Sequence, residues 1–174
     1  MADYTWTDPK IFAETNNVNS VVLNRYLSEN MRYLFKRPRD IVTLRDVGIY
    51  TTTSTSFVAI DTDALRLNIT LQTQADLNFW VNTAMSNTNS GATWTLDILM
   101  DGTTYLSSGT GTPLNRGLAL SNAGGANYND MVGLNYIEED VSAGLHFFDL
   151  YWKVNSGTGT LDTTSATQFG GIEV

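Results

Sequence analysis

The sequence contains no cysteine, and His146 is the single histidine among its 174 residues. A disulfide scaffold and a metal or redox centre built from cysteine are therefore excluded. A zinc site that draws on several histidines is excluded as well. No apolar run approaches the ~20 residues of a membrane span, and the first residues lack the basic and apolar regions of a secretory signal. We therefore expect no membrane partner and a protein released into the cytoplasm that makes it.

Glycine is missing from the first 47 residues, since all 14 glycines lie at or beyond Gly48. Seven of the ten Lys and Arg residues lie at or before Arg45, so residues 47–174 hold three basic and twelve acidic residues, a net charge of −9. An acidic domain repels phosphate backbones, which argues against a nucleic-acid partner. We interpret the basic cluster at residues 36–45 as a solvated helix end whose cations complement the helix dipole.

Residues 1–17 have no regular hydrophobic spacing, yet they carry large apolar side chains: Tyr4, Trp6, Pro9 and Phe12. Such side chains need a surface to bury against. One hypothesis is an extended arm that docks on another protein through these four residues. The alternative is that Trp6 and Phe12 fold back on their own domain.

Residues 18–37 predict an α-helix, because neither Gly nor Pro interrupts them before Pro38 and Asn19 or Ser20 can cap the start. Their apolar stripe follows a heptad spacing, through Leu23, Leu27, Asn30 and Leu34. A lone helix of this length is marginally stable, so it must pack on its own domain or on copies of itself. We predict a subunit interface at these four residues, followed by a linker over residues 38–46.

From Ile41 onward the hydrophobic period is two, the period of half-buried strands. Alternation is clearest over 65–71, 77–82 and 94–100, and the last of these ends at an Asp101-Gly102 turn. We expect further strands at 47–60, 103–107, 115–121, 131–138, 145–155, 159–162 and 168–174. Many short strands between Gly-rich turns predict an antiparallel β-sandwich or barrel over residues 47–174.

Catalytic and metal-binding patterns are weak. His146 has no Gly-x-Ser-x-Gly partner motif, and we expect it to be an ordinary strand residue. The acidic groups Asp61/Asp63 and Glu138–Asp140 stand at strand ends, where calcium is one interpretation and solvated turns are the other. No carboxylate pair stands in an apolar setting that would mark a glycosidase. We expect no enzyme activity, no cofactor and no metal.

Aromatic residues of the strand region offer a different class of function. Trp80 faces opposite to Phe79, and with Tyr105 and Tyr128 it provides candidate residues for stacking on sugar rings. A second sandwich face or a subunit contact explains Trp80 equally well.

Two segments resemble virion proteins of tailed bacteriophages. The first comprises Tyr4-Thr-Trp-Thr-Asp-Pro9, Val21-Val-Leu-Asn24, Leu27-Ser-Glu-Asn-Met-Arg-Tyr-Leu34 and Arg37-Pro38. The second comprises His146-Phe-Phe-Asp-Leu-Tyr-Trp-Lys-Val-Asn-Ser-Gly157, Gln168-Phe169 and Ile172-Glu-Val174. They are similar to a docking arm with its helix and to the closing strands of jelly-roll domains in that class.

The resemblance implies a non-enzymatic structural protein, namely a compact homotrimeric jelly-roll knob on the virion surface. Its arm and helix would anchor it to other virion proteins of the capsid or the tail, after assembly in the host cytoplasm. The alternative is a carbohydrate-binding module of a tail fibre that contacts a host surface glycan. Fold analogy by itself does not choose between these tasks.

Overall fold

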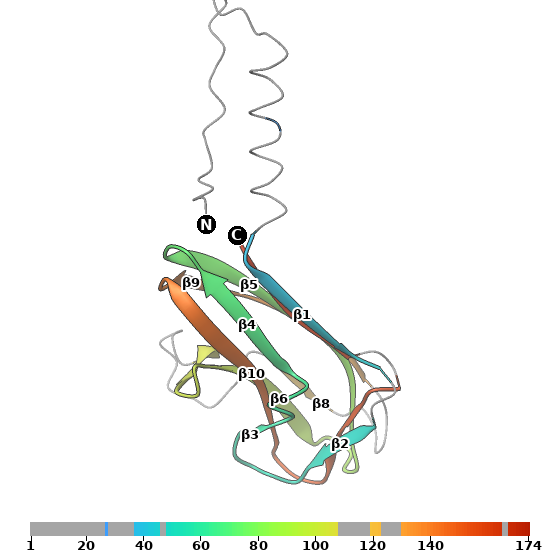
Figure 1. The fold of residues 1–174 in the computed structure, drawn as a ribbon. Coiled ribbons are helices and arrows are strands. Elements are labelled where there is room, and N and C mark those ends of the chain that lie inside the picture. The colour runs from blue at the N-terminus through green and yellow to red at the C-terminus, as the bar shows by residue number, and fades with distance from the viewer. Residues whose placement is uncertain (1–26, 28–36, 46–47, 108–118, 123–129, 165–166) are drawn as a thin grey trace, which may run out of the picture. The chain divides into compact units, whose positions relative to one another are not determined.

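The computed structural model describes residue 27 and residues 37–45, 48–107, 119–122, 130–164 and 167–174. The chain divides into two units, Met1–Arg37 and Pro38–Val174. The strands of the described residues all belong to the second unit (Figure 1). They are β1 (Arg39–Leu44), β2 (Ile49–Thr52), β3 (Val58–Ala59), β4 (Arg66–Leu71), β5 (Ala75–Asn87), β6 (Thr93–Met100), β7 (Thr104–Tyr105), β8 (Ala119–Asn122), β9 (Asp130–Val141), β10 (Gly144–Val154), β11 (Gly159–Asp162) and β12 (Thr167–Glu173).

The first sheet, sheet A, is built around the long strand β5. On one edge of β5 lies β9, and on the other edge β12 and β11 follow each other along the strand. Strand β1 pairs with β12, and β2 pairs with β11, so these two form the outer edge. Sheet A is therefore four strands wide, in the order β1/β2, β12/β11, β5, β9.

The second sheet, sheet B, is built around β10 and β6. Strands β4 and β3 follow each other along one edge of β10, and β6 occupies the other edge. On the far side of β6 lie β8 and β7. Figure 1 shows the two sheets as two layers, with β4 and β10 in one and β1 and β5 in the other. The order β1-β12-β5-β9 against β4-β10-β6-β8 is that of a jelly-roll sandwich.

The core lies between the inner faces of the two sheets. Alternate residues of β5 and β6 point into it, as the fully buried Phe79, Trp94, Leu96 and Ile98 show. The rings of Phe79 from sheet A and Phe148 from sheet B lie 4.7 Å apart between centroids, so they join the layers. Burial of each large apolar side chain contributes about 1.5–3 kcal/mol, which makes this interface the main source of stability.

In sheet A, β1 and β2 follow each other along the edge, and β12 and β11 follow each other beside them. The gap between β1 and β2 lies next to the gap between β11 and β12. The buried Thr163 joins them, because its Oγ1 donates to the carbonyl of Gly48 (2.6 Å) and accepts the N–H of Gly48 (3.0 Å). Gly48 has φ +127°, a conformation that favours glycine. The side chain of Thr163 therefore ties the two gaps to each other.

The structure confirms the mostly β, antiparallel sandwich and several local predictions. Alternation over 65–71, 77–82 and 94–100 matches β4, β5 and β6. Asp101 and Gly102 form the predicted turn with φ of +52° and +68°, closed by a hydrogen bond from the Thr103 N–H to the Met100 carbonyl. One expectation is corrected, because the predicted linker 38–46 contains β1, which closes the edge of sheet A.

The predicted helix over 18–37 lies outside the described residues, apart from Leu27 and Arg37. The arm residues Tyr4, Trp6, Pro9 and Phe12 and the seam residues Leu23, Asn30 and Leu34 also lie outside them. The docking arm and the helical interface therefore stay predictions. Among the described residues, no helix is long and apolar enough to cross a membrane.

Candidate functional site

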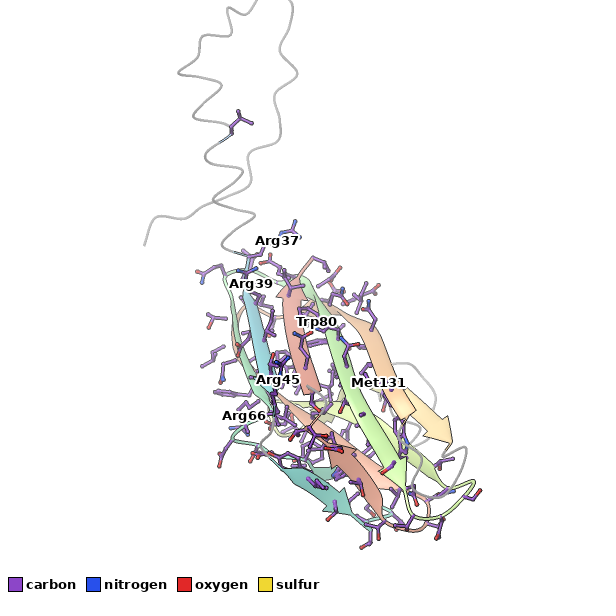
Figure 2. The ribbon with its side chains drawn as sticks, turned by 90° about the vertical axis from the view of Figure 1, so that its right-hand side faces the viewer. Arg37, Arg39, Arg45, Arg66, Trp80 and Met131 are labelled. Carbon is purple, nitrogen blue, oxygen red and sulfur yellow. The ribbon has the colours of Figure 1, made fainter. Side chains whose placement is uncertain are left out.

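The outer side of sheet A, called face A from here on, is the first candidate surface. Because Leu77, Phe79 and Val81 of β5 point into the core, the residues between them point outward. In Figure 2, Trp80 lies in the middle of this face, Arg39 and Arg45 lie toward β1, and Met131 lies on β9. Outward positions of β1, β5, β9 and β12 near Trp80 hold uncharged side chains, namely Ile41, Thr43, Asn78, Asn82, Met131, Asn135, Ile137, Gln168 and Ile172.

Face A exposes large aliphatic side chains to solvent. Met131 is 73 % exposed and Ile49 63 %, while Ile137 and Ile41 are 51 % and 46 % exposed. All four point outward from strands of one sheet, in a protein whose net charge is −8. Arg39 and Asp162 also lie on this face, in the rows of Ile137 and Met131. Large exposed aliphatic side chains gathered on one face of an acidic protein are the kind of surface that another protein covers.

Trp80 is fixed on face A by a glycine of the neighbouring strand. Gly170 pairs with Trp80, and a Cβ atom at Gly170 would overlap Cζ2 of the indole. The half-buried ring therefore lies over the glycine backbone. A glycine inside a strand often marks such a close approach. The indole therefore adds apolar area to face A while its ring stays packed against β12.

The outer side of sheet B, called face B from here on, has the opposite character. Asp97 of β6 is fully buried there, and its carboxylate accepts hydrogen bonds from Ile98 N (2.8 Å), Ser107 N (3.3 Å) and Ser107 Oγ (2.5 Å). Burial raises the pKa of Asp97 above its usual range, although these bonds and the charge of Lys153 oppose the shift. The carboxylate is held by its own chain.

An ion pair lies beside it on face B. The guanidinium of Arg66 donates from Nε to Asp149 Oδ1 (2.7 Å) and from Nη2 to Asp149 Oδ2 (2.8 Å), a two-pronged arrangement across β4 and β10. Asp149 is buried, and hydrogen bonding to it raises the pKa of Arg66. The charges of this pair are satisfied within the domain.

The aromatic rings of Phe57, Tyr105 and Tyr151 form a group elsewhere on face B. Tyr105 lies 5.1 Å from Phe57 and 5.6 Å from Tyr151 between ring centroids, and the Lys153 ammonium lies 4.4 Å from the Phe57 centroid. All three rings are half-buried. Tyr105, a predicted glycan contact, therefore belongs to an aromatic group of face B.

The structure does not bring the predicted glycan residues together. Trp80 lies on face A, whereas Tyr105 lies on face B, on the other side of the core. Tyr128 lies outside the described residues. A sugar that stacked on Trp80 would not reach Tyr105, so the two are not parts of one site.

His146 fastens two turns. Its Nδ1 lies 2.8 Å from Asp101 Oδ2 and its Nε2 lies 2.9 Å from the Ser142 carbonyl oxygen. Both partners are acceptors, so both ring nitrogens donate and the imidazolium form is favoured. Burial lowers the pKa of His146, but the two hydrogen bonds and the charge of Asp101 outweigh it and raise the pKa above its usual value. This geometry is structural.

The acidic groups at strand ends have structural partners too. Asp61 accepts the N–H groups of Asp63 and Ala64 and the hydroxyl of Tyr50, and the Ala64 N–H is the main cause of its lowered pKa. Glu138 accepts the Tyr136 hydroxyl at 3.0 Å. Within the described residues, no group of three or more His, Asp or Glu side chains could hold a metal ion.

Sequence reasoning missed the features that distinguish the two faces. A buried Asp97 is signalled by its apolar neighbours in the β6 sequence Thr-Trp-Thr-Leu-Asp-Ile-Leu-Met. The exposed group of Ile41, Ile49, Met131 and Ile137 has no such signal. Those residues come from three strands that only the sheet pairing places on one face.

No protein-family model and no curated protein matches the chain. Among solved structures, the structure of infectious bursal disease virus Gx strain covers 80 % of this chain at a TM-score of 0.52 and 12 % identity. The crystal structure of the infectious bursal disease virus VP2 subviral particle gives the same coverage, TM-score and identity. This chain covers 32 % and 33 % of those two chains, about a third of their length. At this identity the likeness shows a shared β-sandwich fold.

Proposed function

We propose that this chain is a non-enzymatic structural protein of a virion. The observation that carries the proposal is the jelly-roll sandwich, whose solved neighbours include chains of a viral particle. The hydrogen bonding of His146, Asp61 and Glu138 supports a non-catalytic role, since these groups bind other parts of the same domain.

Within that class, the N-terminal resemblance favours a compact knob on the surface of a tailed bacteriophage, on capsid or tail. Residues 1–17 would dock on the virion through Tyr4, Trp6, Pro9 and Phe12. Residues 18–37 would join three copies through Leu23, Leu27, Asn30 and Leu34. The exposed apolar face A supports self-association, because a surface of this kind needs a cover.

Deleting residues 1–17 from the full chain tests the docking role. We expect the truncated protein to keep its unfolding transition but to be absent from purified particles of the virus that encodes it. The substitution Trp6→Ala should reduce its amount on particles in the same direction. Full incorporation of the truncated protein would contradict the docking role.

A carbohydrate-binding module is the second candidate, and the aromatic group of Phe57, Tyr105 and Tyr151 favours it. The flat apolar faces of these rings are surfaces on which a sugar ring would stack, and the Tyr hydroxyls would bind its polar groups. A glycan array tests it: binding that Tyr105→Ala abolishes and Trp80→Ala leaves unchanged would place the sugar on face B. An array without hits would remove this candidate.

A further inference from the structure

The two edges of sheet A are different surfaces. Strands β1 and β2 form one edge, and β9 forms the other. Within the described residues, each of these strands pairs with a sheet A neighbour on one side only. Strand β4 of sheet B packs beside β1, and its Asn68 N–H donates to Asp40. A second copy would therefore meet the β1 edge from the side of face A.

The edges carry opposite charge. Arg39 and Arg45 are exposed at the β1 edge (Figure 2), where Asp40 is half-buried and hydrogen-bonded within the domain, whereas β9 holds Glu138, Glu139 and Asp140 in succession and no Lys or Arg. Glu139 and Asp140 are exposed. Two copies brought together through the same edge would face like charges, which is unfavourable. One copy's β9 edge against another's β1 edge pairs opposite charges.

The strand register shows which residues of the β1–β2 edge stand in the same row across sheet A as residues of the β9 edge. One row across the sheet runs from Arg39 through Ile172 and Asn78 to Ile137, the residue before the acidic run. A second row runs from Ile49 through Asp162 and Ala84 to Met131. The most exposed large apolar side chains of the described residues, Met131 and Ile49, therefore end the same row on opposite edges.

From this placement we infer that copies of the chain associate head to tail, the β9 edge of one packing against the β1–β2 edge of the next. Met131 contacts Ile49 of the neighbour, and the neighbour's Arg39, which stands in the row of Ile137, reaches along β9 to Glu139, two residues further on. The contact is heterologous, and heterologous contacts close into rings when the rotation permits. The inference rests on the self-association in the proposed function and specifies the surface that carries it.

The proposed contact between copies is made by side chains and not by backbone pairing of two strands. The carboxylate of Asp40 accepts the N–H of Ile41 (2.9 Å) and the N–H of Asn68 (2.7 Å), so β1 already has side-chain hydrogen bonding along its outer edge. Inward charged residues of this kind protect an edge strand from continuous pairing with another strand. The specificity of the contact therefore comes from its charged and apolar rows.

The first experiment blocks one edge at a time in the full chain. Met131→Asp and Ile49→Asp should each abolish the closed oligomer in sedimentation equilibrium, with the unfolding transition unchanged because both residues are exposed. The matched control is Leu145→Asp, an exposed leucine of β10 on face B, which should keep the wild-type mass. Wild-type mass in both edge variants would overturn the inference.

Mixing the two edge variants tests the head-to-tail arrangement. Met131→Asp keeps its β1–β2 edge and Ile49→Asp keeps its β9 edge, so a mixture should form a heterodimer of about 38 kDa, twice the 19.2 kDa chain. Both variants carry Leu27→Asp as well, which disrupts the proposed helical interface, so each variant alone should stay monomeric. An Ile49→Asp protein that dimerises by itself would show a symmetric β9 contact and contradict the proposal.

Charge reversal provides a test that does not place a charge at an apolar position. Arg39→Glu and Glu139→Lys should each weaken association about tenfold, and the double variant should restore it. No recovery in the double variant would contradict the pairing.

Leu27→Asp separates this inference from the proposed helical interface. If Leu27→Asp dissociates the oligomer while Met131→Asp and Ile49→Asp leave it intact, self-association stands and the edge contact is wrong. A monomeric wild-type chain would contradict both.

Discussion

The outer faces of the two sheets differ in which side chains they bury and which they expose. On face B, Asp97 and Asp149 are buried and their carboxylates are bonded within the domain. On face A, Trp80 is surrounded by uncharged side chains, and Met131 and Ile49 lie open to solvent. The buried carboxylates of face B are satisfied within one copy of the chain, although Leu145 and Phe147 are exposed there too. Face A is suited to a cover, and we propose that another copy of the chain provides it.

This difference separates two kinds of residue by what their substitution should change. A residue of face B contributes to the free energy of unfolding, since its loss leaves buried partners without hydrogen bonds. An exposed residue of face A contributes little to that free energy and much to association. Substitutions on face B are therefore tested by unfolding, and substitutions on face A are tested by association.

Asp97→Ala should give the largest loss of stability. It removes the acceptor of Ile98 N, Ser107 N and Ser107 Oγ, and we expect the free energy of unfolding to fall by about 3 kcal/mol in urea titration. Asp97→Asn keeps an acceptor oxygen and removes a charge that burial disfavours, so it should lose less than half as much. Equal losses in the two variants would show that the hydrogen bonds do not hold face B together.

Gly170→Ala should give the next largest effect, because the new methyl group overlaps the Trp80 ring and displaces it from face A. We expect a loss of about 2 kcal/mol and a shift in tryptophan fluorescence. The matched control is Gly133→Ala on β9, where the nearest atom is Asn82 Oδ1 at 3.7 Å. It should leave stability unchanged or raise it slightly; a loss equal to that of Gly170→Ala would mean that strand glycines matter for another reason.

His146→Gln should lower stability by about 1 kcal/mol at acidic pH, through its bonds to Asp101 and Ser142. The folded-state pKa is raised above the unfolded value, so the stabilisation is complete below the unfolded pKa and is lost as the pH rises through the folded pKa. The difference between wild type and His146→Gln should therefore shrink from pH 5 toward pH 8. A difference that grows with pH would contradict the imidazolium clamp.

Met131→Gln should have the smallest effect on unfolding, within about 0.5 kcal/mol, because its side chain is 73 % exposed. The same substitution should reduce the oligomer fraction in dilution experiments. Unfolding that is clearly destabilised in the monomer would mean that Met131 packs within its own domain.

The sequence predicted the centre of the sandwich better than its edges. Alternation in β4, β5 and β6 identified which side chains enter the core, because a strand with one buried face shows its period locally. The sequence places β1 in a linker, because its inward-facing apolar pair, Val42 and Leu44, is short and stands among charged residues. Its partner β12 lies more than 120 residues away, which no local pattern reveals.

The candidate surface was less predictable because its residues also come from strands that lie far apart in the sequence. Trp80 was recognised as outward-facing from its alternation with Phe79, and the structure confirms it. The match of Met131 with Ile49, and of Ile137 with Arg39, depends on a register carried across four strand positions. The sequence therefore predicts the members of a face one strand at a time, and the sheet pairing combines them.

The mass of the purified full-length chain in solution, measured by light scattering, tests the central claim of self-association most directly. The account predicts a concentration-dependent oligomer that saturates near 58 kDa, three times the 19.2 kDa chain. A mass of 19.2 kDa at every concentration would contradict it.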